Sequence, residues 1–371
     1  MNDLLTVRDG VKRLLVATCL LVFSISVFGT IEVIENPRPT HFEKNATFVK
    51  LELVHEIPLD ISDEIFMADP YYLTTGPDGS LYVFDRVIKK IFQFDKNYKF
   101  VRTFGNKGSG PGEFGFGRDF LPIRFSYDGH LYVGEHESQR IAKFSPSGKH
   151  IKDIRLSSGL MTGGPFVPCV DKSGIHYILD WKNHQIKAVD EKMNTLYSLF
   201  NKKDFERVLY VKLSGMDARH WVIPDLRTIK FDVLPNNRLI VYNANGSCVY
   251  IFEKDKLVRK FNFWPEMALK YYKKIAEHRH KNRRSREIFS CIMSYAFFID
   301  RDNEKYFYLQ GSIEGKIKHL HYRFDLEGKL DKIVYTEKYV KLMEKRNNLF
   351  YGIKNGSVQI YKEVSDDKKC I

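Results

Sequence analysis

The sequence predicts an all-β fold, a six-bladed β-propeller whose last blade is closed by the N-terminal strand. A turn–strand–turn–strand pattern occurs six times in the 371 residues, and its first three turn glycines, Gly79, Gly129 and Gly174, are 50 and 45 residues apart. Aromatic residues make up 14% of the chain, which favours strands. One strand near the N-terminus has no partner beside it in the sequence. Repeats of about 40–50 residues with four strands each are typical of propellers.

Residues 1–29 have the features of an export signal. Two basic residues precede an apolar run, and the run over residues 14–29 is 16 residues long. As a helix it would span roughly 24 Å, less than the ~30 Å hydrocarbon core of a bilayer. We therefore expect a cleaved signal and export to the periplasm or the extracellular space, with a membrane anchor as the alternative. Residues 30–47, with two prolines and no apolar period, are expected to form an extended linker.

The segment 48–57 alternates apolar and polar residues, as a half-buried strand does. The sixth repeat, in contrast, ends after three strands, near Glu363. We expect the N-terminal strand to complete this last blade, because an open ring would leave an unpaired sheet edge. The propeller would then cover residues 48–363, followed by a tail at 364–371. The apolar residues of the closing strand would share one face: Val49, Leu51, Leu53 and Ile57.

The second repeat, residues 105–154, shows the pattern most clearly. A glycine-rich loop runs from Gly105 to Gly112 and is closed by Phe114, and the turn at Asp128-Gly129 comes before two short strands. A phosphate-binding loop would need Gly-Lys-Ser/Thr at the start of a helix, and this loop leads into a strand instead. We interpret the loop as a connection between blades. Turns at the corresponding places open the other repeats: 77–80, 171–174, 235–238, 302–305 and 347–348.

The second repeat contains Gly-x-x-Gly-x-Gly-x-Gly-x-Phe, then Asp-Gly-x-Leu-Tyr-Val, then Arg-Ile-x-x-Phe. In these motifs it resembles the NHL repeat, and the region 48–363 resembles the six-bladed NHL-like propellers. The first repeat matches well, whereas the third to sixth match mainly in pattern. The resemblance implies the propeller fold but no single activity, because such propellers include binding modules, lactonases and lyases.

Two insertions interrupt the repeats, at residues 201–228 and 263–290. The second has apolar residues near helical spacing followed by a basic cluster, which predicts a basic helix that projects over one face. With a net charge of +13, this cluster indicates a surface for an anionic partner. The alternative is a solvated helical face. The candidate anion-binding residues are Lys273, Lys274, Arg279, Arg283, Arg284 and Arg286.

A polar residue ends the second strand of each of the first four repeats. These four residues are Asp85, Glu135, Asp180 and Asn243. If the strand ends face the central channel, the four side chains would line it and could hold a cation with oxygen ligands. The alternative is that each carboxylate bonds to backbone in its own blade. No cofactor is predicted, and calcium is the metal that this set would suit.

The four cysteines beyond the leader are widely spaced: Cys169, Cys248, Cys291 and Cys370. They contain no Cys-x-x-Cys pair, so the sequence predicts no zinc site. An oxidising compartment would permit a disulfide, but the spacing leaves its pairing open.

The leading functional prediction is an exported, monomeric, non-enzymatic module that binds a protein, a glycan or a small molecule on one face of the disc. It follows from a clear repeat without a convergent catalytic set. One alternative is a metal-assisted lyase or hydrolase with its site at the mouth of the channel. Another is polyanion binding through the basic insertion. Export disfavours nucleic acid as the partner, and the leader could bring the protein to a membrane surface.

Overall fold

The computed structural model describes most of the predicted propeller. The chain divides into two compact units, Met1–Val33 and Ile34–Ile371, of which the second contains the blades. The predicted leader, most of the linker, both insertions and the tail beyond Val364 lie outside the described residues. The described residues are 32–35, 46–115, 121–135, 138–157, 160–161, 169–180, 182–183, 185–200, 229–243, 248–262, 297–312 and 319–364.

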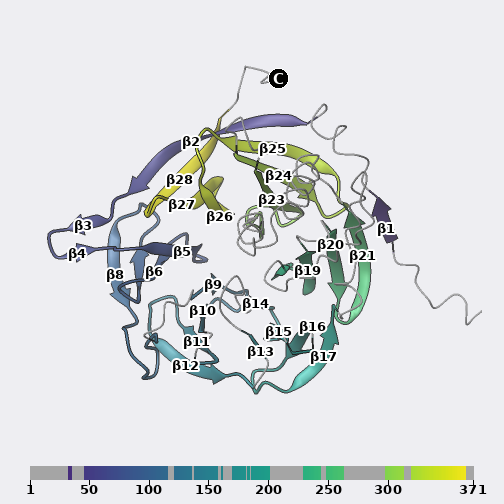
Figure 1. The fold of residues 1–371 in the computed structure, drawn as a ribbon, viewed down its shortest axis with the longest axis horizontal. Helices are drawn as coiled ribbons and strands as arrows, with labels where there is room; N and C mark the ends of the chain where they lie inside the picture. The colour runs from purple at the N-terminus through teal and green to yellow at the C-terminus, as the bar shows by residue number, and fades with distance from the viewer. Residues whose placement is uncertain are drawn as a thin grey trace, which may run out of the picture. The chain divides into compact units, whose positions relative to one another are not determined.

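Six blades, each an antiparallel sheet of four main strands, confirm the predicted fold class (Figure 1). Within the described residues there is no helix, and hence none that could cross a membrane. Blade 1 consists of β5 (Pro70–Thr75), β6 (Leu81–Asp85), β7 (Lys90–Phe94) and β8 (Phe100–Phe104). Blade 2 consists of β9 (Ile123–Phe125), β10 (Leu131–Glu135), β11 (Arg140–Phe144) and β12 (His150–Arg155). Blade 3 consists of β14 (Cys169–Val170), β15 (His176–Asp180), β16 (Gln185–Val189) and β17 (Thr195–Leu199), and β13 (Leu160–Met161) also pairs with β15.

The second half of the ring repeats this order. Blade 4 consists of β18 (Ile229–Val233), β19 (Arg238–Asn243), β20 (Cys248–Glu253) and β21 (Lys256–Asn262). Blade 5 consists of β22 (Phe297–Ile299), β23 (Tyr306–Ser312), β24 (His319–Asp325) and β25 (Leu330–Thr336). Blade 6 consists of β26 (Lys341–Arg346), β27 (Leu349–Lys354), β28 (Ser357–Val364) and the N-terminal β2 (Thr47–Ile57). The remaining strands are β1 (Glu32–Glu35) and a small hairpin of β3 (Asp60–Ser62) and β4 (Ile65–Phe66).

The N-terminal strand β2 closes the ring as the sequence predicts. It pairs antiparallel with β28, with Leu51 opposite Glu363 and Ile57 opposite Val358. Its first residues also pair in parallel with β25, so that blades 5 and 6 share one continuous sheet. The two ends of the chain's β region are thus hydrogen-bonded to each other, and the last blade has no open outer edge.

The prediction that the apolar residues of β2 share one face is wrong. The register shifts between Leu53 and His55, which leaves Val54 as an extra residue, a β-bulge. A bulge reverses the alternation of side chains beyond it. Leu51 therefore packs between blades 5 and 6, whereas Ile57 packs between blades 6 and 1. Leu53 itself is 47% exposed.

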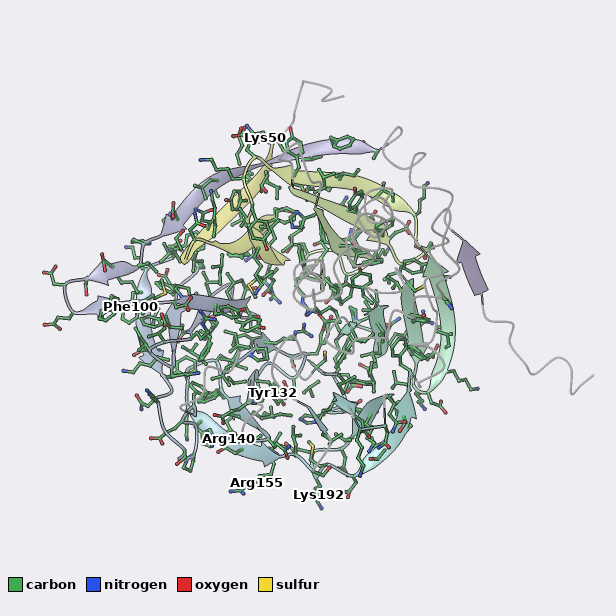
Figure 2. The ribbon with its side chains drawn as sticks, in the orientation of Figure 1. Lys50, Phe100, Tyr132, Arg140, Arg155 and Lys192 are labelled. Carbon is green, nitrogen blue, oxygen red and sulfur yellow. The ribbon has the colours of Figure 1, made fainter. Side chains whose placement is uncertain are left out.

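The hydrophobic core consists of six clusters, one at each interface between neighbouring blades. Each blade alone has two apolar faces, so it is stable only between two neighbours. Large aromatic residues fill these interfaces, and side chains occupy the space between sheets all round the ring (Figure 2). Fully buried examples are Tyr82, Tyr132, Tyr177, Tyr250, Tyr308 and Tyr351.

The first strand of each blade lies nearest the axis, as β5, β9, β14 and β26 show (Figure 1). Contacts join β26 to β5, β5 to β9, β14 to β18, β18 to β22 and β22 to β26. Blades 2 and 3 are joined where the Tyr127 N–H donates to the Val170 carbonyl. These inner strands bring residues from all six repeats around one axis.

The glycine-rich loop is a connection between blades, as expected. Gly105 has a φ of 74°, and a Cβ there would lie 2.3 Å from the ring of Phe114. Phe114 is buried in the cluster between blades 1 and 2. Arg140 fastens the loop to blade 2, because its guanidinium donates to the carbonyls of Gly110 and Glu113.

Candidate functional site

The predicted channel residue Asp85 has its bonds to backbone just before its own blade and in the turn after its strand. Its carboxylate is fully buried and accepts four backbone hydrogen bonds at 2.6–2.9 Å. Two come from Ala68 and Asp69, before blade 1, and two from Val87 and Ile88, in the turn after β6. Four N–H donors satisfy a carboxylate well. Asp85 thus fixes the turn that follows its strand.

Glu135 and Asp180 occupy the same place in blades 2 and 3. Glu135 accepts hydrogen bonds from Gly115 N–H and from the Ser138 hydroxyl, and it pairs with Arg140. Asp180 accepts from Asn183 and pairs with Lys187 at 2.7 Å. Each carboxylate therefore bonds to the loop or strand beside it.

The other predicted site residues are less fully described. Asn243 ends β19, as expected, but its side chain lies outside the description, as do all six candidate anion-binding residues of the second insertion. In the described part of the chain, no group of three or more His, Cys, Asp or Glu side chains is placed to hold a metal ion. The calcium site stays a prediction.

A buried charge network, missed in the sequence, joins the inner strands of different blades. Asp232 on β18 is 3% exposed and lies between two arginines. Its Oδ1 is 3.1 Å from Nη1 of Arg124 on β9, and its Oδ2 is 2.8 Å from Nη2 of Arg301, which follows β22. Blades 2 and 4 are not neighbours in a ring of six, so Arg124 meets Asp232 inside the ring.

The network continues across the axis between opposite blades. Arg301 of blade 5 donates from Nη1 to the hydroxyl oxygen of Tyr127 of blade 2 at 3.1 Å. Tyr127 in turn donates to Glu304 Oε1 at 2.7 Å. Tyr127, Arg301 and Glu304 all follow the ends of their inner strands. Side chains of opposite blades therefore meet at the end of the axis where the inner strands finish.

The opposite end, where the inner strands begin, is lined by basic and aromatic side chains. Lys341, the first residue of β26, has Nζ 4.6 Å from the ring centre of Tyr71 and 4.8 Å from that of Tyr72. Arg86 also lies over the Tyr71 ring, at 4.6 Å. Cation–π contacts of this kind favour the charged forms of lysine and arginine.

Lys230, the second residue of β18, is partly exposed between two core residues, Ile229 and Phe231. Burial, together with the charges of Lys341 and Arg124, lowers its pKa to about 7. These three residues come from blades 2, 4 and 6, and alternate blades can bring charges together only near the axis. We call Arg124, Lys230 and Lys341 the axial basic site.

Among the described residues, two carboxylates act on Arg124 of the axial basic site, Asp232 and Glu344, and Glu344 is also bonded to Thr75. Burial and the charge of Arg86 lower the pKa of Lys341 to about 8. The Cys169 thiol accepts a hydrogen bond from Arg124, but burial raises its pKa to about 12, so it adds no negative charge at neutral pH. Asp232 is the carboxylate in direct contact with the site, and it is shared between two arginines.

The sequence did contain a signal for this site. Arg124 and Lys230 each stand between two buried apolar residues in the strand that precedes a repeat's first turn. A lysine or arginine is seldom found in a strand that is buried on both faces, so its presence there indicates a special role. These positions lie in the first strands, away from the second-strand ends and the basic insertion where the site residues were predicted.

A model of the DUF5128 family, described as a 6-bladed β-propeller, matches residues 41–212. A search of curated proteins found no match. Among solved structures, a Bacteroides fragilis protein described as a candidate exported protein is similar, with a TM-score of 0.55 and 12% identity. The match covers 90% of this chain and 99% of that chain.

Two enzymes have weaker similarity. Virginiamycin B lyase from Staphylococcus aureus has a TM-score of 0.48 and 9% identity, over 84% of this chain and 99% of the lyase. A gluconolactonase from Xanthomonas campestris has a TM-score of 0.47 and 11% identity, over 84% and 99%. Identities this low bear on the fold alone. The six blades in a closed ring, the family model and the Bacteroides structure agree that the chain is a six-bladed β-propeller.

Proposed function

We propose that this protein is an exported, NHL-like propeller that binds a small ligand carrying negative charge at the axial basic site. The observation that carries the proposal is the convergence of Arg124, Lys230 and Lys341 from three alternate blades, where the carboxylate that contacts Arg124, Asp232, is shared with Arg301. Export is supported by the apolar leader and by the description of the Bacteroides relative.

The two ends of the axis differ in a way that favours binding at one of them. Tyr127 and Arg301 bond to each other where the inner strands finish. Lys230 and Lys341 lie where the strands begin, with Tyr71 beside Lys341. A carboxylate or phosphate there would receive charge-assisted hydrogen bonds, each worth about 1.5–3 kcal/mol. It would also relieve the repulsion among the three cations.

The proposal is tested by titration calorimetry with small carboxylates and phosphates and with their neutral esters. We expect the anions to bind and the esters to bind at least tenfold more weakly, since one lost charge-assisted contact costs at least about 1.4 kcal/mol. Lys341→Met should weaken anion binding by a similar factor, whereas Lys192→Met, on the outer rim (Figure 2), should not change it. Equal binding by the Lys341 variant and the parent protein would refute the proposal.

A further inference from the structure

We infer that the ligand of the axial basic site is an acidic sugar, in which a sugar ring carries a carboxylate. The carboxylate binds Lys341, and the ring packs against three tyrosines near that lysine: Tyr71, Tyr72 and Tyr339. We call these three residues the tyrosine wall. The inference rests on the proposed function and names the class of ligand that the site takes.

A β-bulge at Tyr71 brings two consecutive tyrosine rings to one ammonium group. The register of β5 against β6 shifts between Pro70 and Tyr72, which leaves Tyr71 as an extra residue. In a regular strand the two rings would point to opposite faces of the sheet, and a bulge re-aims one of them. The ring centres are 5.1 Å apart, and Nζ of Lys341 on blade 6 is 4.6 Å from one and 4.8 Å from the other. Blades 1 and 6 thus form one surface that is both aromatic and cationic.

The Lys341 ammonium group is placed to donate to a ligand. Within the described part of the chain, no carboxylate or carbonyl oxygen lies within hydrogen-bond or ion-pair distance of its Nζ, whose contacts are the two tyrosine rings. Arg86, the other cation over the Tyr71 ring, differs because its Nε donates to Asp69 at 2.8 Å. An ammonium group has three N–H donors, so Lys341 can hold a carboxylate by charge-assisted hydrogen bonds.

Tyr339 extends the tyrosine wall towards solvent. It stands two residues before Lys341 in the chain, and it is 47% exposed. Burial raises the pKa of Tyr71, and Tyr339 adds to this rise because its hydroxyl lies nearby. The exposed ring of Tyr339 therefore offers a ligand an apolar surface beside the ammonium group.

The lining has one aromatic side and a polar remainder, which suits a sugar ring better than a flat aromatic acid. The tyrosine wall comes from β5 and the start of β26, whereas Arg124 and Lys230 bring polar donors from β9 and β18. A pyranose has an apolar C–H face and hydroxyls around its rim. Its face can pack on tyrosine while its hydroxyls accept hydrogen bonds from the cations. A flat aromatic acid would desolvate these donors with its second face and give them no acceptor.

The test is titration calorimetry of the full-length protein with glucuronate, acetate, glucose and benzoate at one salt concentration. We expect glucuronate to bind at least about tenfold more tightly than each of the other three, because it alone engages both the ammonium group and the tyrosine wall. Tyr339→Ala should lower the affinity for glucuronate about fivefold or more and that for acetate by less than about twofold. Tyr339→Phe keeps the ring and should keep the preference for glucuronate. Phe66→Ala is the matched control, because Phe66 is 55% exposed on the β3–β4 hairpin, away from the axis (Figure 1).

The four ligands separate this inference from the proposed function. If acetate binds and Lys341→Met weakens it, but glucuronate binds no more tightly than acetate, the acidic sugar is refuted and the proposed function stands. The acidic sugar is also refuted if benzoate binds as tightly as glucuronate, or if Tyr339→Ala leaves the preference for glucuronate intact. If glucose binds as tightly as glucuronate while acetate does not bind, charge has no part in recognition and the proposed function fails.

Discussion

Replacing Lys230 by methionine should stabilise the protein, because the folded structure disfavours the charged amine. In the unfolded chain this amine has its ordinary pKa of 10.5, and burial with two cationic neighbours lowers it to about 7 in the fold. At pH below 7 the folded protein therefore carries a penalty of roughly 5 kcal/mol, taken at 1.36 kcal/mol per pKa unit. Local relaxation reduces this upper bound, and we expect a gain of about 2–4 kcal/mol for Lys230→Met at pH 6.

The stability that Lys230→Met gains over the parent protein should decrease as the pH rises. Because the unfolded state binds the extra proton between pH 7 and 10.5, the stability of the parent protein rises with pH in that window, and the advantage of the variant shrinks. Between pH 7 and 9 the gain should fall by about 2–3 kcal/mol. Lys341 titrates in both proteins, so its contribution largely cancels in the difference.

Urea unfolding at pH 6, 7 and 9 measures this difference directly. Lys192→Met is the matched control: Lys192 is exposed on the rim, and its removal should change stability by less than about 0.5 kcal/mol at every pH. A gain for Lys230→Met that is the same at pH 6 and 9 would contradict the electrostatic reasoning. A loss of stability at all three values would show that Lys230 is a structural residue.

Three further changes test the fold and the network around the site. Asp85→Ala should cost about 3 kcal/mol or more in urea unfolding, because it leaves four buried N–H groups without their acceptor. Asp232→Asn should cost about 3 kcal/mol. Because it removes a negative charge, it should also raise the affinity for anions in calorimetry; a lower affinity would contradict the charge argument. Deletion of Thr47–Ile57 should prevent folding as judged by circular dichroism, and the same segment fused after the C-terminus should restore it.

The fold could be predicted because its signals are local and repeated. The Asp128-Gly129 turn requires a positive φ, which Gly129 adopts at 77°, and each such turn sets the register of the strands beside it. Ring closure could also be predicted, from one strand without a partner and one blade lacking a strand. The bulge at Val54 could not, because nothing in alternating apolar residues marks where an extra residue enters.

The site was harder to predict because its residues are far apart in the chain. Arg124, Lys230 and Lys341 are brought together by ring closure. A cation between two apolar residues, as at Arg124 and Lys230, does not show in the sequence which other cations it will meet. The carboxylates that seemed most notable in the sequence, such as Asp85, stand at strand ends where turns need acceptors. A carboxylate at a turn improves stability, whereas a cation placed among other cations reduces it. The proposed binding of an anion would offset this cost, and proteins commonly give up stability at the sites where they bind charge.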